Sequence, residues 1–221
     1  MFQNREEAGR RLAEKLRAYA GQEETIVLGV PRGGVVVAYE VAKALDLPLD
    51  VLVLRKLGVP WQEELAFGAI APGGVRILDD ETLEMLSLSA ADIERVAAKE
   101  QIELDRRERT YRAGKPPLDL RGKTVILVDD GIATGASARA AIRALRAMGP
   151  QRIVLAVPVA PRTTADRLGA DADEVVCEEM PETFYAIGQF YRDFLPVEDQ
   201  EVIGLLVRAT PQTPESAGRK T

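Results

Sequence analysis

The 221-residue sequence contains no histidine, and this absence excludes several kinds of active site. Catalysis by Ser–His–Asp or Cys–His groups needs an imidazole, as does a zinc site with histidine ligands. The single cysteine, Cys177, excludes an internal disulfide framework and suits a reducing compartment. Any metal ion would therefore be a hard cation held by oxygen atoms, and Mg²⁺ is the natural candidate.

Long apolar runs are also missing. The N-terminal residues are charged, and no stretch has the length of a signal peptide or a membrane span, so we expect a cytoplasmic protein without membrane contact. The formal net charge of −6 argues against a nucleic-acid surface and fits small-molecule chemistry. Asparagine occurs once, at Asn4, and basic residues are mostly arginine, a composition that a thermophilic source would explain.

The most informative stretch has the sequence VILVDDGIATGAS and runs from Val125 to Ser137. Its four leading aliphatic residues are typical of a strand buried on both faces of a parallel sheet. Asp129 and Asp130 follow at the carboxyl end of this strand, and a turn with two glycines then leads into a helix that Ser137 is expected to cap. Ligands bind at the carboxyl ends of such strands.

The turn has the features of an anion site. Several backbone N–H groups of a glycine-rich turn point one way, the helix dipole adds positive potential, and the Thr134 and Ser137 hydroxyls are further donors. Asp129 and Asp130 would instead accept hydrogen bonds from hydroxyls or face a metal ion. A phosphate beside a diol suggests a phosphorylated sugar. The alternative is that two acids and two glycines merely end a strand and begin a turn.

This stretch resembles the phosphoribosyl-pyrophosphate loop of type I phosphoribosyltransferases, in which a hydrophobic run and two acids precede a Thr-Gly pair. The resemblance implies that Asp129 and Asp130 hold the ribose 2- and 3-hydroxyls. The two aspartates are also the candidates to bind Mg²⁺, either directly or only through waters or substrate hydroxyls. The resemblance also implies a cradle for the 5-phosphate, formed by Ala133, Thr134, Gly135, Ala136 and Ser137. Relatives that act on 6-oxopurines usually carry an aspartate where Ala133 stands, which argues against hypoxanthine or guanine or moves the proton-handling role elsewhere.

The sequence GVPRGG follows a strand predicted over Thr25 to Val30 and matches neither a dinucleotide fingerprint nor a P-loop. In the family, the loop at this place holds the leaving pyrophosphate, often through a non-proline cis peptide. The resemblance therefore assigns Arg32, Gly33 and Gly34 to pyrophosphate binding. Arginine offers a planar fork for phosphate oxygens, and glycine lets backbone N–H groups approach closely. An ordinary surface turn is the alternative.

Arg55 and Lys56 directly follow a second strand, predicted over Asp50 to Leu54, and a long segment containing glycine and proline comes next. This arrangement is typical of the mobile loop that closes over pyrophosphate in the family, so both cations are predicted to be catalytic. A solvated Arg–Lys pair is the alternative. Short strands are predicted over residues 65–71 and 75–78.

Residues 79–117 are predicted to form a charged helical insertion. Ser89 and Asp92 resemble a capping box, but the apolar stripe is sparse, so we expect the helix to lie outside the core. It would lean on the active-site face or on another subunit, or it is a solvated helix without a role in binding.

Two further strands are predicted over 152–159 and 174–177. Residues 178–208 then contain much of the small aromatic content, and a final helix is predicted over 199–209. In the family, this region forms a hood over the sugar and carries base contacts. Phe184, Tyr185 and Tyr191 are candidates to stack on a base, and packing of the hood against the core is the alternative. Residues 210–221, rich in proline, serine and threonine, are predicted to be disordered.

Together these features predict one α/β domain over residues 1–209, with a twisted, mostly parallel sheet flanked by helices. The resemblance implies a Mg²⁺-dependent transfer of 5-phosphoribosyl from phosphoribosyl pyrophosphate to a nitrogenous base, in a homodimer. A regulator of the same fold, which binds phosphoribosyl pyrophosphate or a nucleotide without turnover, is the competing hypothesis. The sequence identifies neither the acceptor base nor a general base.

Overall fold

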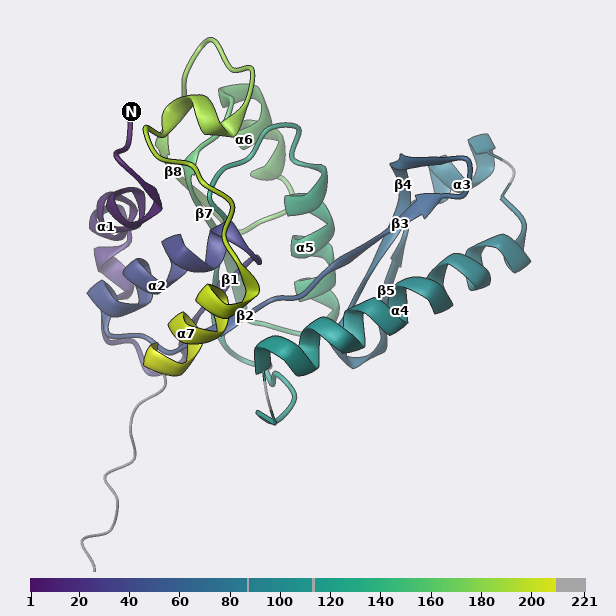
Figure 1. The fold of residues 1–221 in the computed structure, drawn as a ribbon, viewed down its shortest axis with the longest axis horizontal. Coiled ribbons are helices and arrows are strands. Elements are labelled where there is room, and N and C mark those ends of the chain that lie inside the picture. Colours follow the sequence, from purple (N-terminus) through teal and green to yellow (C-terminus); the bar gives the residue numbers. More distant parts are fainter. Residues whose placement is uncertain (87, 113, 210–221) are drawn as a thin grey trace, which may run out of the picture.

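The computed structural model describes residues 1–86, 88–112 and 114–209 and contains two β-sheets (Figure 1). The central sheet has five strands, all parallel, in the order β2-β1-β6-β7-β8, as expected for this class. Its strands are β1 (Thr25–Gly29), β2 (Leu49–Val51), β6 (Thr124–Val128), β7 (Arg152–Val159) and β8 (Glu174–Glu179).

Helices cover both faces of this sheet because successive strand residues point to opposite sides. On one face, Val27 packs in a cluster with α1 (Arg5–Lys15), α2 (Gly33–Leu45) and α7 (Asp199–Ala209). On the other, Leu28 packs with α5 (Ala136–Ala147) and α6 (Arg162–Leu168). Both faces being buried explains why β1, β6 and β7 are mostly aliphatic. The first helix begins after the Asn4 cap and ends at Lys15, and the short 3₁₀ helix η1 (Arg17–Tyr19) follows it.

The second sheet corrects two predictions. The segment expected to be a loop after Arg55 and Lys56 is a β-hairpin, and the strand expected over residues 50–54 already ends at Val51. The predicted strands over 65–71 and 75–78 are present and complete an antiparallel sheet. Its elements are β3 (Arg55–Val59), β4 (Gln62–Ala71), the 3₁₀ turn η2 (Pro72–Gly74) and β5 (Val75–Leu78).

The helical insertion consists of α3 (Asp80–Leu86) and α4 (Ala90–Arg112), which lie with the second sheet as an arm beside the central domain (Figure 1). The expectation that this insertion stays outside the core is wrong. Ala97, Leu104 and Tyr111 are buried in the same cluster as the central sheet, because β3 and α7 provide apolar surfaces on which a sparse stripe can pack.

Between β8 and α7, the hood contains little regular structure beyond the 3₁₀ helix η3 (Ile187–Phe190). The N-terminal segment is hydrogen-bonded to the hood. Phe2 N–H donates to Phe190 O at 2.7 Å, and Arg192 N–H donates to Phe2 O at 2.9 Å. The Phe2 side chain is fully buried. No helix among the described residues has the length and apolarity needed to cross a membrane. The tail predicted to be disordered, 210–221, lies outside the described residues.

Candidate functional site

The predicted anion turn lies between β6 and α5. Helix α5 begins at Ala136 and its cap residue is Gly135, at φ +84°, so the prediction that Ser137 caps the helix is wrong. The observed cap, a left-handed residue, stands two positions before the predicted one, and this conformation favours glycine. A hydrogen bond from α6 stabilises the turn, because Thr164 Oγ1 donates to Ala133 O at 3.0 Å. Ser137 lies in the first helical turn and is exposed, as is Thr134.

The acid pair stands at the carboxyl end of β6, where the sequence predicted it. Asp129 Oδ1 accepts a hydrogen bond from Asp130 N–H at 2.9 Å. Burial, and then the charge of Asp130, raise the pKa of Asp129 well above its usual range. Burial also raises the pKa of Asp130, although the hydrogen bond and charge of Arg5 oppose this shift. The site therefore holds two carboxylates whose ionisation is costly without a compensating ligand or cation.

Gly33 and Gly34 open α2 and pack directly against this acid pair. A Cβ at Gly33 would overlap Asp130 Oδ2, and a Cβ at Gly34 would lie 2.8 Å from Asp129 Cα. The neighbouring peptide bond, Pro31–Arg32, is cis. The two predicted sites thus meet at one edge of the sheet, since β1 and β6 are adjacent parallel strands. The glycines are needed here for close packing, while their contact with pyrophosphate stays a prediction.

Arg32 is partly exposed and lies near the start of α7. Its Nη1 is 3.8 Å from Glu198 Oε2 and 3.9 Å from Asp199 Oδ1. Asp199 Oδ1 also accepts the Tyr111 hydroxyl at 2.6 Å, and burial with this contact raises the pKa of Tyr111 to about 12. The guanidinium is therefore held loosely, at distances that leave its donors able to turn toward an anion.

Arg5 belongs to the site, and the sequence reasoning missed it. Its Nε donates to Asp130 Oδ2 at 2.8 Å across 125 positions of sequence, and its side chain is 10% exposed. A signal was present, because Arg5 shares the buried face of α1 with Ala8 and Leu12 at helical spacing. A charged residue on a buried face needs a partner of opposite charge, but the sequence does not say which one.

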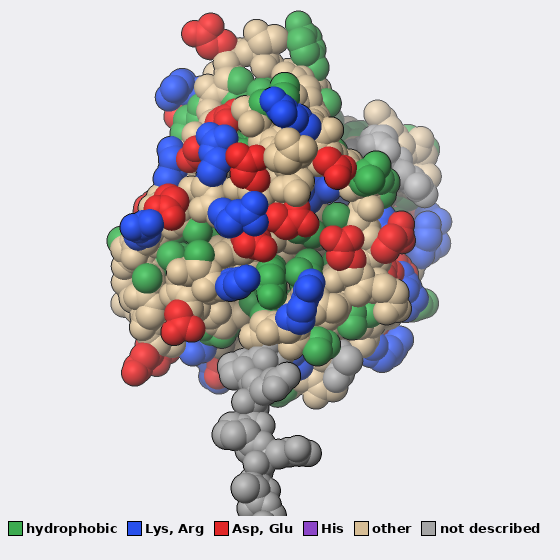
Figure 2. All heavy atoms as spheres, turned by 60° about the vertical axis from the view of Figure 1, so that its left-hand side comes forward, with side chains coloured by type: hydrophobic (Ala, Val, Ile, Leu, Met, Phe, Trp, Pro, Cys, Tyr) green, Lys and Arg blue, Asp and Glu red, His purple; other side chains and the backbone are tan. Residues whose placement is uncertain are grey.

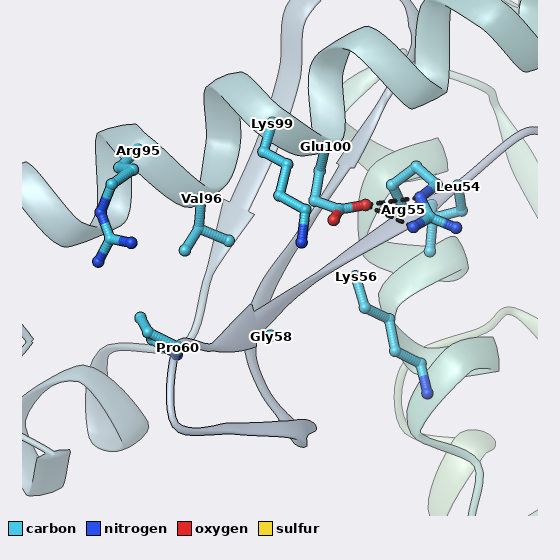
Figure 3. Close-up of a pocket in the computed structure, with 9 residues that line it drawn as sticks. All are labelled: Leu54, Arg55, Lys56, Gly58, Pro60, Arg95, Val96, Lys99 and Glu100. Atoms are coloured by element: carbon cyan, nitrogen blue, oxygen red, sulfur yellow. Dashed lines mark hydrogen bonds and ion pairs between the residues drawn. The ribbon is translucent and has the colours of Figure 1, made fainter.

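Arg55 and Lys56 point in different directions. Arg55 Nε donates to Glu100 Oε2 of α4 at 2.7 Å, and Figure 3 shows Lys56 pointing away from this ion pair. Between β3 and α4 lies a pocket of 460 Å³, to which α4 adds Arg95 and Lys99. Lys56 also lines a hollow on α5 beside Ala136, the first helical residue after the anion turn. The position of Lys56 fits the predicted role better than that of Arg55.

The three stacking candidates are placed differently. Tyr191 is 6% exposed between Phe2 and Phe194, and its hydroxyl donates to Asp130 O at 2.5 Å, so no ring face remains for a base. Phe184 is half-buried and packs on Phe190 with ring centroids 5.2 Å apart. Tyr185 is 87% exposed. Packing of the hood therefore explains Tyr191, and Tyr185 is the candidate with an open ring.

The carboxylates of this site could hold Mg²⁺ only if oxygen atoms of the substrate complete its coordination. No group of three or more histidine, cysteine, aspartate or glutamate residues within the described ranges could hold a metal ion. One oxygen of Asp130 already accepts from Arg5. Mg²⁺ is commonly bound by one or two carboxylates together with waters and substrate phosphates, which is compatible with this site.

Comparisons with known proteins agree with this geometry. Residues 2–195 match the model of a phosphoribosyl transferase domain. The Mycobacterium tuberculosis H37Rv protein named "Putative phosphoribosyl transferase Rv0571c" is 50% identical over 209 residues, which are 95% of this chain and 47% of that protein. The chain thus spans about half the length of this relative.

Two further relatives come from Thermus thermophilus. The crystal structure of TT1426 superimposes with a TM-score of 0.84 at 43% identity, covering 94% of this chain and 98% of that one. "Bifunctional protein PyrR" is 53% identical over 49 residues, which are 22% of this chain and 27% of PyrR.

Proposed function

The chain belongs to the phosphoribosyl transferase domain family, and from this premise we propose that it transfers 5-phosphoribosyl from phosphoribosyl pyrophosphate to a nitrogen of a base, releasing pyrophosphate. One observation carries the proposal: the acid pair of β6, its anion turn and the cis Arg32 loop of β1 meet at one edge of the sheet. A diol site beside an anion turn suits a ribose 5-phosphate, and a second loop with an arginine suits the leaving pyrophosphate.

The chemistry follows from where charge develops. As the bond from the sugar C1 to pyrophosphate breaks, positive charge grows on the ribose ring and negative charge on the leaving group. Asp129 and Asp130 would orient the ribose through its hydroxyls and stand near the cation. Arg32 and Lys56 would stabilise the pyrophosphate, an electrostatic contribution that is usually large in catalysis. Mg²⁺ bound through pyrophosphate oxygens would neutralise further negative charge.

The first experiment measures pyrophosphate release from phosphoribosyl pyrophosphate with Mg²⁺ across a panel of purine and pyrimidine bases. Release that depends on one base would support the transferase and identify the acceptor. Release with no base, or with every base equally, would argue against group transfer to a specific acceptor.

Variants of the acid pair test the site. Asp130→Ala would leave the buried Arg5 without its carboxylate, a change that costs about 3–5 kcal/mol in comparable pairs, so asparagine is the better substitution. We expect Asp129→Asn combined with Asp130→Asn to abolish turnover in a folded protein. Asp119→Asn, at an exposed aspartate paired with Arg121, is the matched control and should retain full activity.

Tyr185 is the residue that we propose for contact with the acceptor. If its exposed ring stacks on the base, Tyr185→Ala should raise the KM for the base about tenfold or more. The KM for phosphoribosyl pyrophosphate should not change. An unchanged KM for the base would remove Tyr185 from the acceptor site.

The competing function is a regulator that binds phosphoribosyl pyrophosphate or a nucleotide without turnover. Two sequence features favour it: the chain has no histidine, and Ala133 stands where some relatives have a proton-handling aspartate. Calorimetric binding of phosphoribosyl pyrophosphate without pyrophosphate release from any base would support the regulator. The homodimer is a prediction of the family resemblance, which sedimentation of the purified chain tests.

A further inference from the structure

Three contacts fix the Arg5 guanidinium beside the acid pair. Its Nε donates to Asp130 Oδ2 at 2.8 Å, and its Nη1 donates to Leu195 O of the hood at 2.9 Å. Its carbon Cζ lies 3.9 Å from the centre of the Phe194 ring, which covers one face of the guanidinium. An arginine held on one face and by two donors has little rotamer freedom left, so its position is defined before any ligand arrives.

Elements distant in sequence produce this position. Asn4 Oδ1 accepts from Glu7 N–H at 2.9 Å, which begins α1 and places Arg5 in its first turn. The Phe2 backbone pairs with the hood, which brings Phe194 and Leu195 over Arg5. From the other side, a Cβ at Gly33 would lie 2.8 Å from Arg5 Nε. Glycine at the start of α2 is therefore what leaves room for the contact between Arg5 and Asp130.

From these contacts we propose that Arg5 is a positioning residue for ribose binding: it holds Asp130 by Oδ2 and thereby directs the second carboxylate oxygen to a sugar hydroxyl. This inference rests on the proposed function. It extends that function, because Arg5 comes from the N-terminal helix and reaches the ribose only through Asp130. Without the cation, two adjacent carboxylates would repel each other in a buried site, and Asp130 would lose its fixed orientation.

Arg11 offers a matched control on the same helix. It too makes an ion pair, to Glu178 at 2.7 Å, and it lies over an aromatic ring, with Cζ 4.6 Å from the centre of Phe2. Its carboxylate partners are on β8, away from the acid pair of β6. Arg11→Gln therefore removes a similar set of interactions without changing the orientation of Asp130.

The test uses the full chain and two probes that separate the parts of the site, ribose 5-phosphate and inorganic pyrophosphate. We expect Arg5→Gln to weaken ribose 5-phosphate binding about tenfold, the effect of one hydrogen bond to a charged group, and to leave pyrophosphate binding unchanged. Arg5→Lys keeps the charge and should recover part of the loss, while Arg11→Gln should change neither affinity. If Arg5→Gln lowers the affinity for both probes equally, or if Arg11→Gln lowers the affinity for ribose 5-phosphate as much, the effect is a general structural one and the inference is overturned.

A comparison within the Asp130→Asn background covers the case in which Arg5→Gln alone does not fold. If Arg5 acts through Asp130, Arg5→Gln in the Asp130→Asn background should cause no further loss of ribose 5-phosphate affinity. A further loss there would overturn the inference. A different result would contradict the proposed function. If Asp129→Asn combined with Asp130→Asn leaves the affinity for ribose 5-phosphate unchanged, the acid pair is not the ribose site, whatever the role of Arg5.

Discussion

At the scale of single residues, the site is defined by close packing around two carboxylates. Gly33 and Gly34 approach the acid pair so closely that any side chain would displace it. Arg5 and the backbone N–H of Asp130 then occupy one oxygen of each aspartate. The two glycines, which were predicted to contact pyrophosphate, thus have a packing role, which is to let α2 touch the end of β6.

Gly33→Ala should therefore impair function through Asp130. The new methyl group must displace Asp130 Oδ2 or Arg5 Nε, and we expect a loss of about 1–3 kcal/mol in stability together with a large fall in turnover. Gly204→Ala in α7 is the control, because nothing lies within 4 Å of a Cβ there. That variant should gain up to about 1 kcal/mol, the usual difference between glycine and alanine in a helix. Thermal unfolding and turnover measure both effects, and a fully active Gly33→Ala would contradict the packing argument.

The raised pKa of Asp129 makes a prediction about pH. A carboxyl group whose pKa is higher in the folded state binds its proton more tightly there, so it lowers stability as pH rises from its unfolded value, about 4, through the folded value. Asp129→Asn does not titrate, and its Asn Oδ1 can still accept from the backbone N–H of Asp130. We expect the variant to melt at a higher temperature than the parent at pH 7, with the difference shrinking toward pH 4.

Asp119→Asn is the control for this experiment. Hydrogen bonding from Arg121 lowers the pKa of Asp119, so replacing this aspartate should give no gain in melting temperature at pH 7. A melting temperature of Asp129→Asn that stays at or below the parent value at pH 7 would contradict the raised pKa of Asp129.

At the scale of elements, the inserted arm is joined to the central sheet by a buried ion pair. Arg112, at the end of α4, donates through Nε and Nη2 to the two oxygens of Asp50 on β2, each at 3.2 Å. Both residues are buried, and Arg112 Nη2 also donates to Pro116 O at 2.6 Å. The helix thus ends on the edge strand of the sheet, which keeps the arm in place beside the site.

We expect Asp50→Ala to destabilise the fold by about 3–5 kcal/mol, because it leaves a buried guanidinium without a carboxylate. Asp119→Ala breaks an exposed ion pair with Arg121 and should cost no more than about 1 kcal/mol. Urea unfolding of the two variants measures the comparison. Equal midpoints would show that the Arg112 pair is not buried in solution.

At the scale of the whole molecule, the N-terminal segment closes the hood over the acid pair. Phe2 is fully buried in a cluster with Tyr191, and Phe184, Phe190 and Phe194 pack around it. Beyond this cluster, basic and acidic side chains are interspersed on the face shown in Figure 2. No large surface of one sign is visible on that face among the described residues.

Phe2→Ala should lower stability by about 3–5 kcal/mol, as for other buried phenylalanines, and should also weaken ribose 5-phosphate binding. The second effect follows because the hood residues that hold Arg5 depend on Phe2. Val207→Ala, at an exposed position of α7, should change neither property. The prediction is wrong if the Phe2 variant loses stability but keeps full ribose 5-phosphate affinity at a temperature where it is folded.

Local features of the chain determined much of this protein. Aliphatic runs and β-branching predicted the five parallel strands, and the sequence also predicted a helix after the anion turn (α5) and one at the end of the hood (α7), because these patterns depend on neighbours within a few residues. The acid pair and the anion turn could be predicted for the same reason, because strand, turn and helix follow one another within the continuous stretch from Val125 to Ser137. Glycine at position 135 explains the single local error there, since a left-handed residue ended the turn before Ser137.

Only the tertiary structure determined which residues distant in sequence are in contact. Arg5 and Asp130 are 125 positions apart, and the burial of Tyr191 depends on an N-terminal segment that pairs with the hood. The segment after Arg55 has the glycine and proline of a loop, yet it forms a hairpin because β5 and α4 cover it. Pairing partners and burial are properties of contacts that are distant in sequence, and local periodicity contains no information about them.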